Sequence, residues 1–343
     1  MAYCLRLTMS PPSATAARPL AAHSVVAYLA GRGIVPADAE LAVEELAGGV
    51  SSPVLAVRGE GIALVVKQAL PRLRVAEEWH APARRTDTEA AALRLAGRLL
   101  PGRVPVVVDS DGDEHVVVMQ HAPPGWRNWQ SEILAGRVHA ARGAWAGETL
   151  ARLHSATAGD AEVAAEFDDH EAFELLRLDP YHEAVMRRIP GLAGAIEPLV
   201  EELRSARICL VHGDYAPKNI LLGRDGAWVI DAEVAHVGHP VFDLAFFLAF
   251  PLLIALRRPE LAGSCGELAD SFTAAYARRA GHLMPPARSL ASHTGAMLLA
   301  RTDGKSPATF LNPPAARRAR ALGERLLADP SALAVGGLAA ALA

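Results

Sequence analysis

Residues 209–231 of this 343-residue chain read Cys-Leu-Val-His-Gly-Asp-Tyr-Ala-Pro-Lys-Asn-Ile-Leu-Leu-Gly-Arg-Asp-Gly-Ala-Trp-Val-Ile-Asp, and this stretch decides the fold. Asp214 and Asn219 stand five positions apart after a strand-like apolar run, and a second apolar run leads into Asp231. A carboxylate, a carboxamide and a second carboxylate in this order suit a site that deprotonates a hydroxyl beside metal-bound nucleotide phosphates. Asp and Asn are also ordinary loop residues, so the spacing alone carries little information. The adjoining His212-Gly213 and the two apolar runs favour the active-site interpretation.

Composition describes a globular protein with ample material for a core, because 51% of the residues are hydrophobic. The net charge of −4 offers no basic surface for nucleic acid, so we expect none as a partner. The three cysteines form neither a disulfide framework nor a zinc spacing, which indicates a reducing cytoplasm. The longest apolar stretch, residues 244–256, contains Pro251 and is too short to cross a bilayer. It predicts a buried helix and no membrane partner; the oligomeric state stays open.

The order of predicted elements indicates an α+β, bilobal architecture. A mobile leader (residues 1–23) is expected to precede a small β-rich N-lobe (24–124) that binds a nucleotide, and a larger, mostly helical C-lobe (125–343) to carry catalysis and substrate binding. The hinge is predicted at Pro-Pro-Gly, within 120–125. In the N-lobe the periodicity predicts helices at 24–32 and 86–99, and strands at 41–46, 54–58, 62–68, 104–108 and 115–119. In the C-lobe it predicts helices at 136–154, 169–178, 196–205, 240–256, 267–281 and 287–300, and in the last thirty residues.

The N-lobe holds candidates for nucleotide binding. Lys67 ends an apolar strand, where its ammonium would grip phosphates; the alternative is a surface lysine at a strand end. Glu89 opens the next helix and would orient Lys67, or it is a first-turn acid stabilised by the helix dipole. A glycine- and serine-containing loop between the first two strands would bring backbone N–H groups close to phosphates, although such loops are common in hairpins. Its candidate residues are Gly48, Gly49, Ser51 and Ser52.

Further C-lobe residues have two interpretations each. Asp243 would accept hydrogen bonds from the loop around His212, or it is an N-terminal helix acid. We expect His212 to be a packed loop organiser without a role in proton transfer. Residues 160–183 hold nine acids and one base, Arg177, which predicts either a pocket for a polycation or a solvated helix face. The polar segment 301–306 either lines the substrate cleft or is an ordinary loop.

At these residues the chain resembles the aminoglycoside phosphotransferase/choline kinase superfamily, which has the protein-kinase fold. The likeness runs from about residue 41 to 300 and rests on His-Gly-Asp-x4-Asn, the following Ile-Asp and Asp243-Leu-Ala. The resemblance implies that Asp214 is the catalytic base and that Asn219 and Asp231 bind magnesium. It also implies that Lys67 contacts the phosphates of ATP, or of GTP.

A narrower likeness is to methylthioribose kinases. Residues 66–71 (Val-Lys-Gln-Ala-Leu-Pro) with 74–79 resemble their amino lobe, as do residues 179–181 and 231–233 farther along. The loop between Asp214 and Asn219 departs from that family, because it reads Tyr-Ala-Pro-Lys. There Lys218 would lie near the transferred phosphate or pair with a neighbouring acid, while Glu233 would assist the metal or fix its loop.

The function predicted is that of a magnesium-dependent small-molecule kinase. It would transfer the γ-phosphate of ATP (or GTP) to a hydroxyl of an aminoglycoside-like or sugar-like acceptor. One alternative is a methylthioribose-type sugar kinase of nucleoside salvage. The other is a non-catalytic nucleotide-binding pseudokinase, against which the intact Lys67, Asp214, Asn219 and Asp231 argue.

Overall fold

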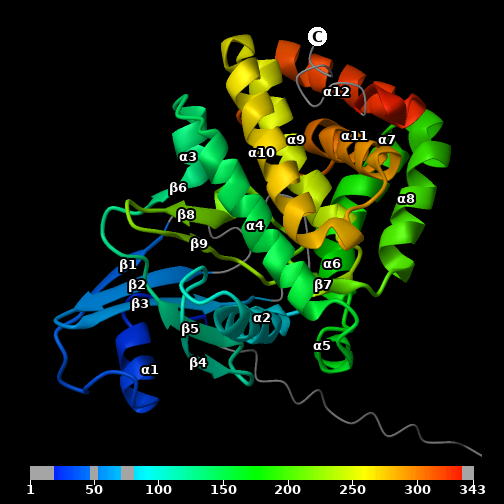
Figure 1. The fold of residues 1–343 in the computed structure, drawn as a ribbon. Helices are drawn as coiled ribbons and strands as arrows, with labels where there is room; N and C mark the ends of the chain where they lie inside the picture. The colour runs from blue at the N-terminus through cyan, green and yellow to red at the C-terminus, as the bar shows by residue number, and fades with distance from the viewer. Residues whose placement is uncertain (1–18, 47–52, 71–80, 334–343) are drawn as a thin grey trace, which may run out of the picture.

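The computed structural model describes residues 19–46, 53–70 and 81–333, and the structural statements that follow concern these residues. A small lobe built on a β-sheet lies against a larger helical lobe (Figure 1), which confirms the predicted α+β bilobal architecture. The expected leader lies largely outside the described residues, as does the whole glycine- and serine-containing loop.

The small lobe contains one antiparallel sheet in the strand order β1-β2-β3-β5-β4. Its elements are α1 (Val25–Gly31), β1 (Ala42–Glu45), β2 (Val54–Gly59), β3 (Ile62–Gln68), α2 (Arg85–Leu99), β4 (Val107–Asp111) and β5 (Val116–Gln120). Alternate residues of β5 face opposite sides: Val116 and Val118 pack in the cluster that includes α1, whereas Val117 lies in the core that includes α2. Lys67 is paired with Val117, so its side chain is on the α2 side of the sheet.

The strand predicted at 104–108 begins three residues later than expected, at Val107. Val106 and Val108 are exposed, and the pairing with β5 shifts between Val107 and Asp109. The valine-rich composition therefore marked a strand but misplaced its start, because pairing with β5 sets the register.

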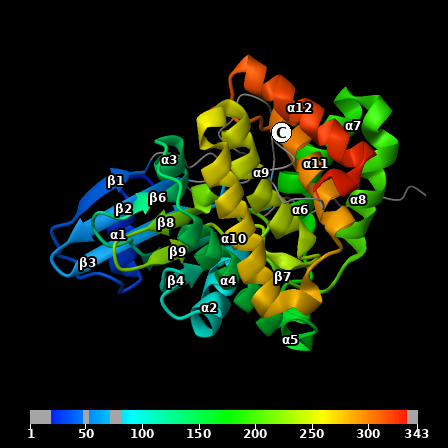
Figure 2. The same cartoon turned by 45° about the horizontal axis from the view of Figure 1, so that its top comes forward.

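The large lobe is mostly helical (Figures 1 and 2). Its elements are β6 (Arg127–Asn128), α3 (Trp129–Leu134), α4 (Ala140–Thr157), α5 (Ala161–Glu166), α6 (Glu171–Phe173), a π-helical segment (Glu174–Glu183), α7 (Ala184–Arg188), α8 (Ala193–Ser205), β7 (Cys209–Val211), β8 (Ile220–Leu222), β9 (Ala227–Val229), β10 (His236–Gly238), α9 (Val241–Arg257), α10 (Ala262–Ala280), α11 (Ala287–Asp303) and α12 (Pro313–Ala328). Short 3₁₀ turns lie at Pro190–Leu192, Pro217–Asn219, Pro259–Leu261, Gly281–Leu283 and Pro330–Leu333. The sequence did not predict α3, α5 and α7, which are only five or six residues long.

Helices α4 and α10 approach closely at two glycines of α4. A Cβ on Gly143 would be 2.2 Å from the Leu268 carbonyl oxygen, and one on Gly147 would be 2.1 Å from that of Phe272. The absence of side chains at these positions allows the backbones to touch.

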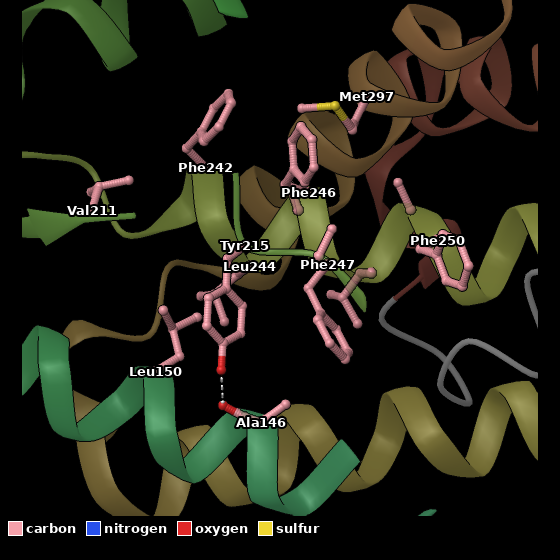
Figure 3. Close-up of a cluster of buried hydrophobic side chains, with 14 of the residues drawn as sticks. Ala146, Leu150, Val211, Tyr215, Phe242, Leu244, Phe246, Phe247, Phe250 and Met297 are labelled. Carbon is pink, nitrogen blue, oxygen red and sulfur yellow. Dashed lines mark hydrogen bonds between the residues drawn. The ribbon is translucent and has the colours of Figure 1, made fainter. Parts of the chain in front are cut away.

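Helix α9 is the buried helix predicted from its apolar run, and its first fifteen residues are buried. Figure 3 shows its aromatic side chains, with Tyr215 donating a 2.8 Å hydrogen bond to the Ala146 carbonyl. Phe247 also stacks on Phe272, with ring centroids 3.9 Å apart. The residue after Asp214 is thus anchored in the core. Within the described ranges, no helix is both long and apolar enough to cross a membrane.

Candidate active site

Two strand pairs carry the loop with the predicted catalytic residues. β7 leads into His212-Gly213-Asp214, and the 3₁₀ turn that holds Asn219 leads into β8; Asp231 follows β9. Gly213 has φ +75°, and a Cβ there would lie 2.7 Å from the Val234 carbonyl oxygen. Asp231 has φ +69°, an uncommon conformation for a residue other than glycine. The loop is therefore held in a conformation that few sequences allow.

Asp243 holds the start of this loop through hydrogen bonds to its backbone. Its Oδ2 accepts the His212 backbone N–H at 2.7 Å and lies 3.2 Å from Nε2 of His154, while its Oδ1 accepts the Gly213 N–H at 2.9 Å. The carboxylate is fully buried, which by itself would raise its pKa, but His154 and the N–H of His212 hold the pKa of Asp243 below its ordinary value. The structure confirms that Asp243 anchors the loop.

His212 is packed within the loop, as predicted. It is buried, its Nε2 lies 3.2 Å from the Ile230 carbonyl oxygen, and its Nδ1 accepts the Asp214 N–H at 3.2 Å. Burial lowers the pKa of His212, so the ring is neutral at pH 7. It holds the two halves of the motif together.

The carboxylate of Asp214 has one crowded oxygen. Oδ2 lies 2.9 Å from Nη2 of Arg177 and 2.8 Å from Nδ2 of Asn219, and it accepts a hydrogen bond from the Lys218 ammonium. Its buried Oδ1 has no hydrogen-bond partner in the part of the chain that the structure describes. A carboxylate oriented through one oxygen, with a lone pair free on the other, can accept the proton of a hydroxyl.

Three carboxylates surround the ammonium of Lys67. Its Nζ lies 2.8 Å from Glu89 Oε2, 2.5 Å from Asp231 Oδ1 and 3.3 Å from Glu233 Oε2. Burial alone would lower the pKa of Lys67, but these carboxylates together raise it above its usual range. Burial would also raise the pKa of Asp231, but Lys67 lowers it, whereas burial raises the pKa of Glu89 to about 7. Lys67, Glu89 and Asp231 are thus brought into one buried cluster.

The sequence interpretation missed two arginines of the site. Arg85 is fully buried, with Nε 3.3 Å from Glu233 and Nη1 bonded to three backbone carbonyls. Glu233 thus pairs with both Arg85 and Lys67, which suits a role in fixing its loop. Its carboxylate also lies close to those of Glu89 and Asp231, so the alternative role at a metal ion stays a prediction. Arg177 reaches Asp214 from the π-helical segment and also donates to the Gly213 carbonyl at 2.8 Å. Its sequence signal was the environment Leu176-Arg177-Leu178, a lone base between apolar residues in an acidic run.

A cleft of about 750 Å³ lies between the lobes, and the described candidate residues line it except for Asp214, which is buried behind its partners Lys218 and Asn219. Lys67, Glu89, Lys218, Asn219 and Asp231 line its polar part. Val54, Val65, Met119 and Trp228 are among its apolar lining residues. The cleft therefore offers apolar walls for a flat ring at one side and cations with carboxylates at the other.

Asn219 and Asp231 also present the donor types that a hard divalent cation prefers. Both line the cleft, and a carboxamide oxygen and a carboxylate are typical oxygen ligands of magnesium. The Asn219 amide nitrogen donates to the Asp214 carboxylate and carbonyl, so its amide oxygen is oriented away from these bonds. The residues present fit a magnesium site, in which the Asp231 carboxylate would bind the ion in place of the Lys67 ammonium.

A second, smaller pocket adjoins the cleft. Phe246, Phe250, Met297 and Phe310 supply its apolar walls, and Lys218, Gln130 and Arg301 supply its polar groups. Lys218 and Gln130 line both the pocket and the cleft. Of the segment 301–306, Arg301 thus lines a pocket together with Lys218, and its Nη1 donates to the Ser306 carbonyl at 2.5 Å.

The acidic run 160–183 does not form the polycation pocket considered from the sequence. Asp169 pairs with Arg84, Asp179 with Arg187 at 2.8 Å, and Glu174 with Arg204. None of its acids is among the described residues that line the cleft or the smaller pocket. The alternative interpretation, a solvated and ion-paired face, describes it better.

Comparison with known proteins agrees with this fold. Residues 42–282 match the sequence model of the phosphotransferase enzyme family. Methylthioribose kinase 2 of Oryza sativa subsp. japonica is 28% identical over 267 residues, covering 67% of this chain and 62% of that protein. Methylthioribose kinase of Bacillus velezensis is 32% identical over 222 residues, covering 57% and 56%. The chain thus spans about three fifths of the length of these curated relatives.

A solved structure shares the fold at low sequence identity. The structure of an amicoumacin kinase in complex with AMP-PNP, Ca²⁺ and Ami has a TM-score of 0.51 at 15% identity, covering 83% of this chain and 88% of that one. The predicted protein-kinase-like fold is confirmed, and so is the resemblance to methylthioribose kinases within the wider superfamily.

Proposed function

The chain belongs to the phosphotransferase enzyme family, and from this premise we propose that it is a small-molecule kinase that transfers the γ-phosphoryl group of ATP to a hydroxyl of a sugar-like acceptor. The observation that carries the proposal is the state of Asp214. Its carboxylate is held through Oδ2 by Arg177, Lys218 and Asn219, and its Oδ1 has no partner among the described residues. Lys218 and Asn219 line the cleft, whose volume of about 750 Å³ is large enough for a nucleotide.

In the proposed mechanism the protein acts mainly by positioning and by charge. Asp214 Oδ1 orients the acceptor hydroxyl and receives its proton as the oxygen attacks phosphorus. Lys67, oriented by Glu89, contacts the nucleotide phosphates. Asn219 and Asp231 would hold magnesium, which when bound would neutralise phosphate charge. The comparisons support ATP as the donor, because AMP-PNP is bound in a protein of the same fold, and they offer no support for GTP.

The acceptor side favours the methylthioribose-type alternative over an aminoglycoside. The smaller pocket has a volume of only about 30 Å³, so it would take a small substituent of the acceptor and not the whole molecule. Its polar groups include Lys218 and Arg301, which would repel a polycation, whereas its aromatic and methionine side chains suit an apolar substituent of a neutral acceptor. The curated relatives are methylthioribose kinases, so methylthioribose is the first acceptor to be tested.

The test is a coupled assay of magnesium-dependent ATP consumption with methylthioribose, other sugars, amino alcohols and kanamycin. We expect turnover with a sugar-like acceptor and none with kanamycin. The Asp214→Asn variant should lose turnover while binding ATP normally in a thermal-shift titration, with GTP as the comparison donor. Full activity in this variant would refute the role of Asp214. ATP binding without turnover on any acceptor would instead favour the pseudokinase.

A further inference from the structure

Resting on the function proposed above, we propose that Lys218 is a catalytic residue whose ammonium leaves Asp214 to neutralise the phosphoryl group in transit, and that Arg177 makes this movement possible by remaining on Asp214. The sequence left Lys218 with two interpretations, a phosphate contact or a pair with an acid. The structure shows Lys218 paired with Asp214. The surroundings of this pair indicate that the Lys218 ammonium has a second position, beside the phosphoryl group.

The composition of the chain is the first argument. Only three of its 34 Lys and Arg residues are lysines, at positions 67, 218 and 305. Two of these three, Lys67 and Lys218, line the same cleft. In a chain that otherwise uses arginine for its positive charges, a lysine here indicates a need for a compact, rotatable ammonium where a planar guanidinium would not serve.

Location is the second argument. The phosphoryl group must pass from the nucleotide cleft to the acceptor, through the place where the two cavities meet. Lys218 lines both cavities and is a cation, while Gln130, which also lines both, is neutral. The side chain of Lys218 is 41% exposed, so it is free to swing on its four-carbon stem. An ammonium near the three non-bridging oxygens would offset the charge that develops there.

The fixed position of Arg177 is the third argument. Its side chain is 10% exposed, and Nε, Nη1 and Nη2 are engaged by the Gly213 carbonyl, the Leu176 carbonyl and Asp214, respectively. When Lys218 departs, Asp214 Oδ2 still has Arg177 at 2.9 Å and Asn219 at 2.8 Å. The buried carboxylate is then not left without a counter-charge, which would otherwise make the movement costly.

The step balances without any further reactant. The acceptor oxygen forms a bond to the γ-phosphorus, the bond from that phosphorus to the β–γ bridging oxygen breaks, and its electron pair stays on ADP. The acceptor proton goes to Asp214 Oδ1. Lys218 keeps its proton throughout and only donates hydrogen bonds.

The first test uses a reactive nucleotide on the full chain. An acyl-phosphate derivative of ATP transfers its acyl group to an amine beside the terminal phosphate, and mass spectrometry then reads out the three lysines separately. We expect Lys218 to be acylated and to be protected by excess ATP. Lys305, which pairs with Asp179 at 2.7 Å away from the cleft, serves as the internal control and should show no ATP-sensitive labelling.

The second test compares a mimic of the transition state with the product. The mimic is ADP with magnesium and aluminium fluoride, and the product is ADP alone. The wild type should bind the mimic more tightly than ADP, and in Lys218→Met we expect this ratio of affinities to fall by about 10²–10³-fold while the affinity for ADP hardly changes. The matched control Lys305→Met should leave the preference intact, and Lys218→Arg should restore it only in part.

Two results would overturn the inference while leaving the proposed function standing. One is that the wild-type chain binds ATP but Lys218 is not acylated, or is acylated to the same extent with and without excess ATP. The other is a folded Lys218→Met variant with the preference of the wild type. Failure of the wild-type chain to bind ATP would refute the proposed function and the inference with it.

Discussion

Replacing Asp243 with alanine should lower the free energy of unfolding by several kcal/mol, and the size of the loss follows from the contacts that Asp243 makes. The substitution leaves two buried backbone N–H groups, those of His212 and Gly213, without their acceptors. Each such group costs about 1–3 kcal/mol, so the free energy of unfolding should fall by about 2–6 kcal/mol. If Asp243 were only a first-turn helix acid, the loss would be about 0.3–1 kcal/mol.

Urea denaturation followed by circular dichroism measures this difference directly. Asp243→Asn should lose less than Asp243→Ala, because its carbonyl oxygen still accepts one N–H bond. Asp270→Ala, an exposed aspartate of α10, is the control and should change stability by less than about 0.5 kcal/mol. A loss below 1 kcal/mol for Asp243→Ala would refute the reasoning, because two orphaned donors cannot cost so little.

The pH dependence of the same variant gives a second check. The folded-state pKa of Asp243 is lowered, so its ionised form contributes stability above about pH 4, the ordinary value for Asp, and that contribution is lost as pH falls through the folded pKa. The alanine variant should therefore lose less stability than the wild type on acidification below pH 4. Parallel acid-denaturation curves would contradict this assignment.

Three further changes test other parts of the fold. Burial raises the pKa of Glu89 to about 7, so at mildly acidic pH the folded chain binds a proton that the unfolded chain releases; stability should fall as the pH rises from 5 to 7, and Glu89→Gln should reduce this fall in urea titrations at the two pH values. Burial raises the pKa of Cys265 to about 11 and that of Cys209 further, so in a Cys4→Ser variant, where these are the two remaining cysteines, both thiols should react with Ellman's reagent at pH 8 only after unfolding; rapid reaction of this native variant would show that they are accessible. Gly147→Ala should lower stability by about 1–3 kcal/mol in calorimetry, because the new methyl group would overlap the carbonyl of Phe272; a gain, as expected for this change in an unobstructed helix, would mean that α4 and α10 are not in contact.

Local periodicity was sufficient to predict much of the small lobe and its buried cluster. The apolar run along 62–68 placed Lys67 near the end of a strand, and the helical spacing of 86–99 placed Glu89 at the start of the next helix. These two residues are brought together because the sheet and α2 share a core, a consequence of packing that α+β lobes of this order have in common. Their 2.8 Å contact was therefore within reach of the sequence.

The contacts of Arg177 and Arg85 could not be predicted from the sequence. Each joins residues far apart in the chain, Arg177 to Asp214 and Arg85 to Glu233, and neither partner carries a periodic signal. The π-helical segment that presents Arg177 was predicted only as part of an ordinary helix ending at residue 178. Its wider turn depends on packing against the rest of the lobe, which no local propensity encodes.

The acidic run shows why a charge run in the sequence is a poor guide to the charge of a pocket. Its acids are matched by arginines that come from elsewhere in the chain, such as Arg84 and Arg204, so little of the run's charge is left for a ligand. The charged groups that line the smaller pocket, Lys218 and Arg301, are instead positive. Two like charges about 5–6 Å apart repel by about 3 kcal/mol at an effective dielectric constant of 20, which corresponds to about a hundredfold in affinity for each ammonium of a bound polycation. By our proposal, the pocket would therefore select against aminoglycosides through Lys218, the same cation that we infer accompanies the phosphoryl group to its acceptor.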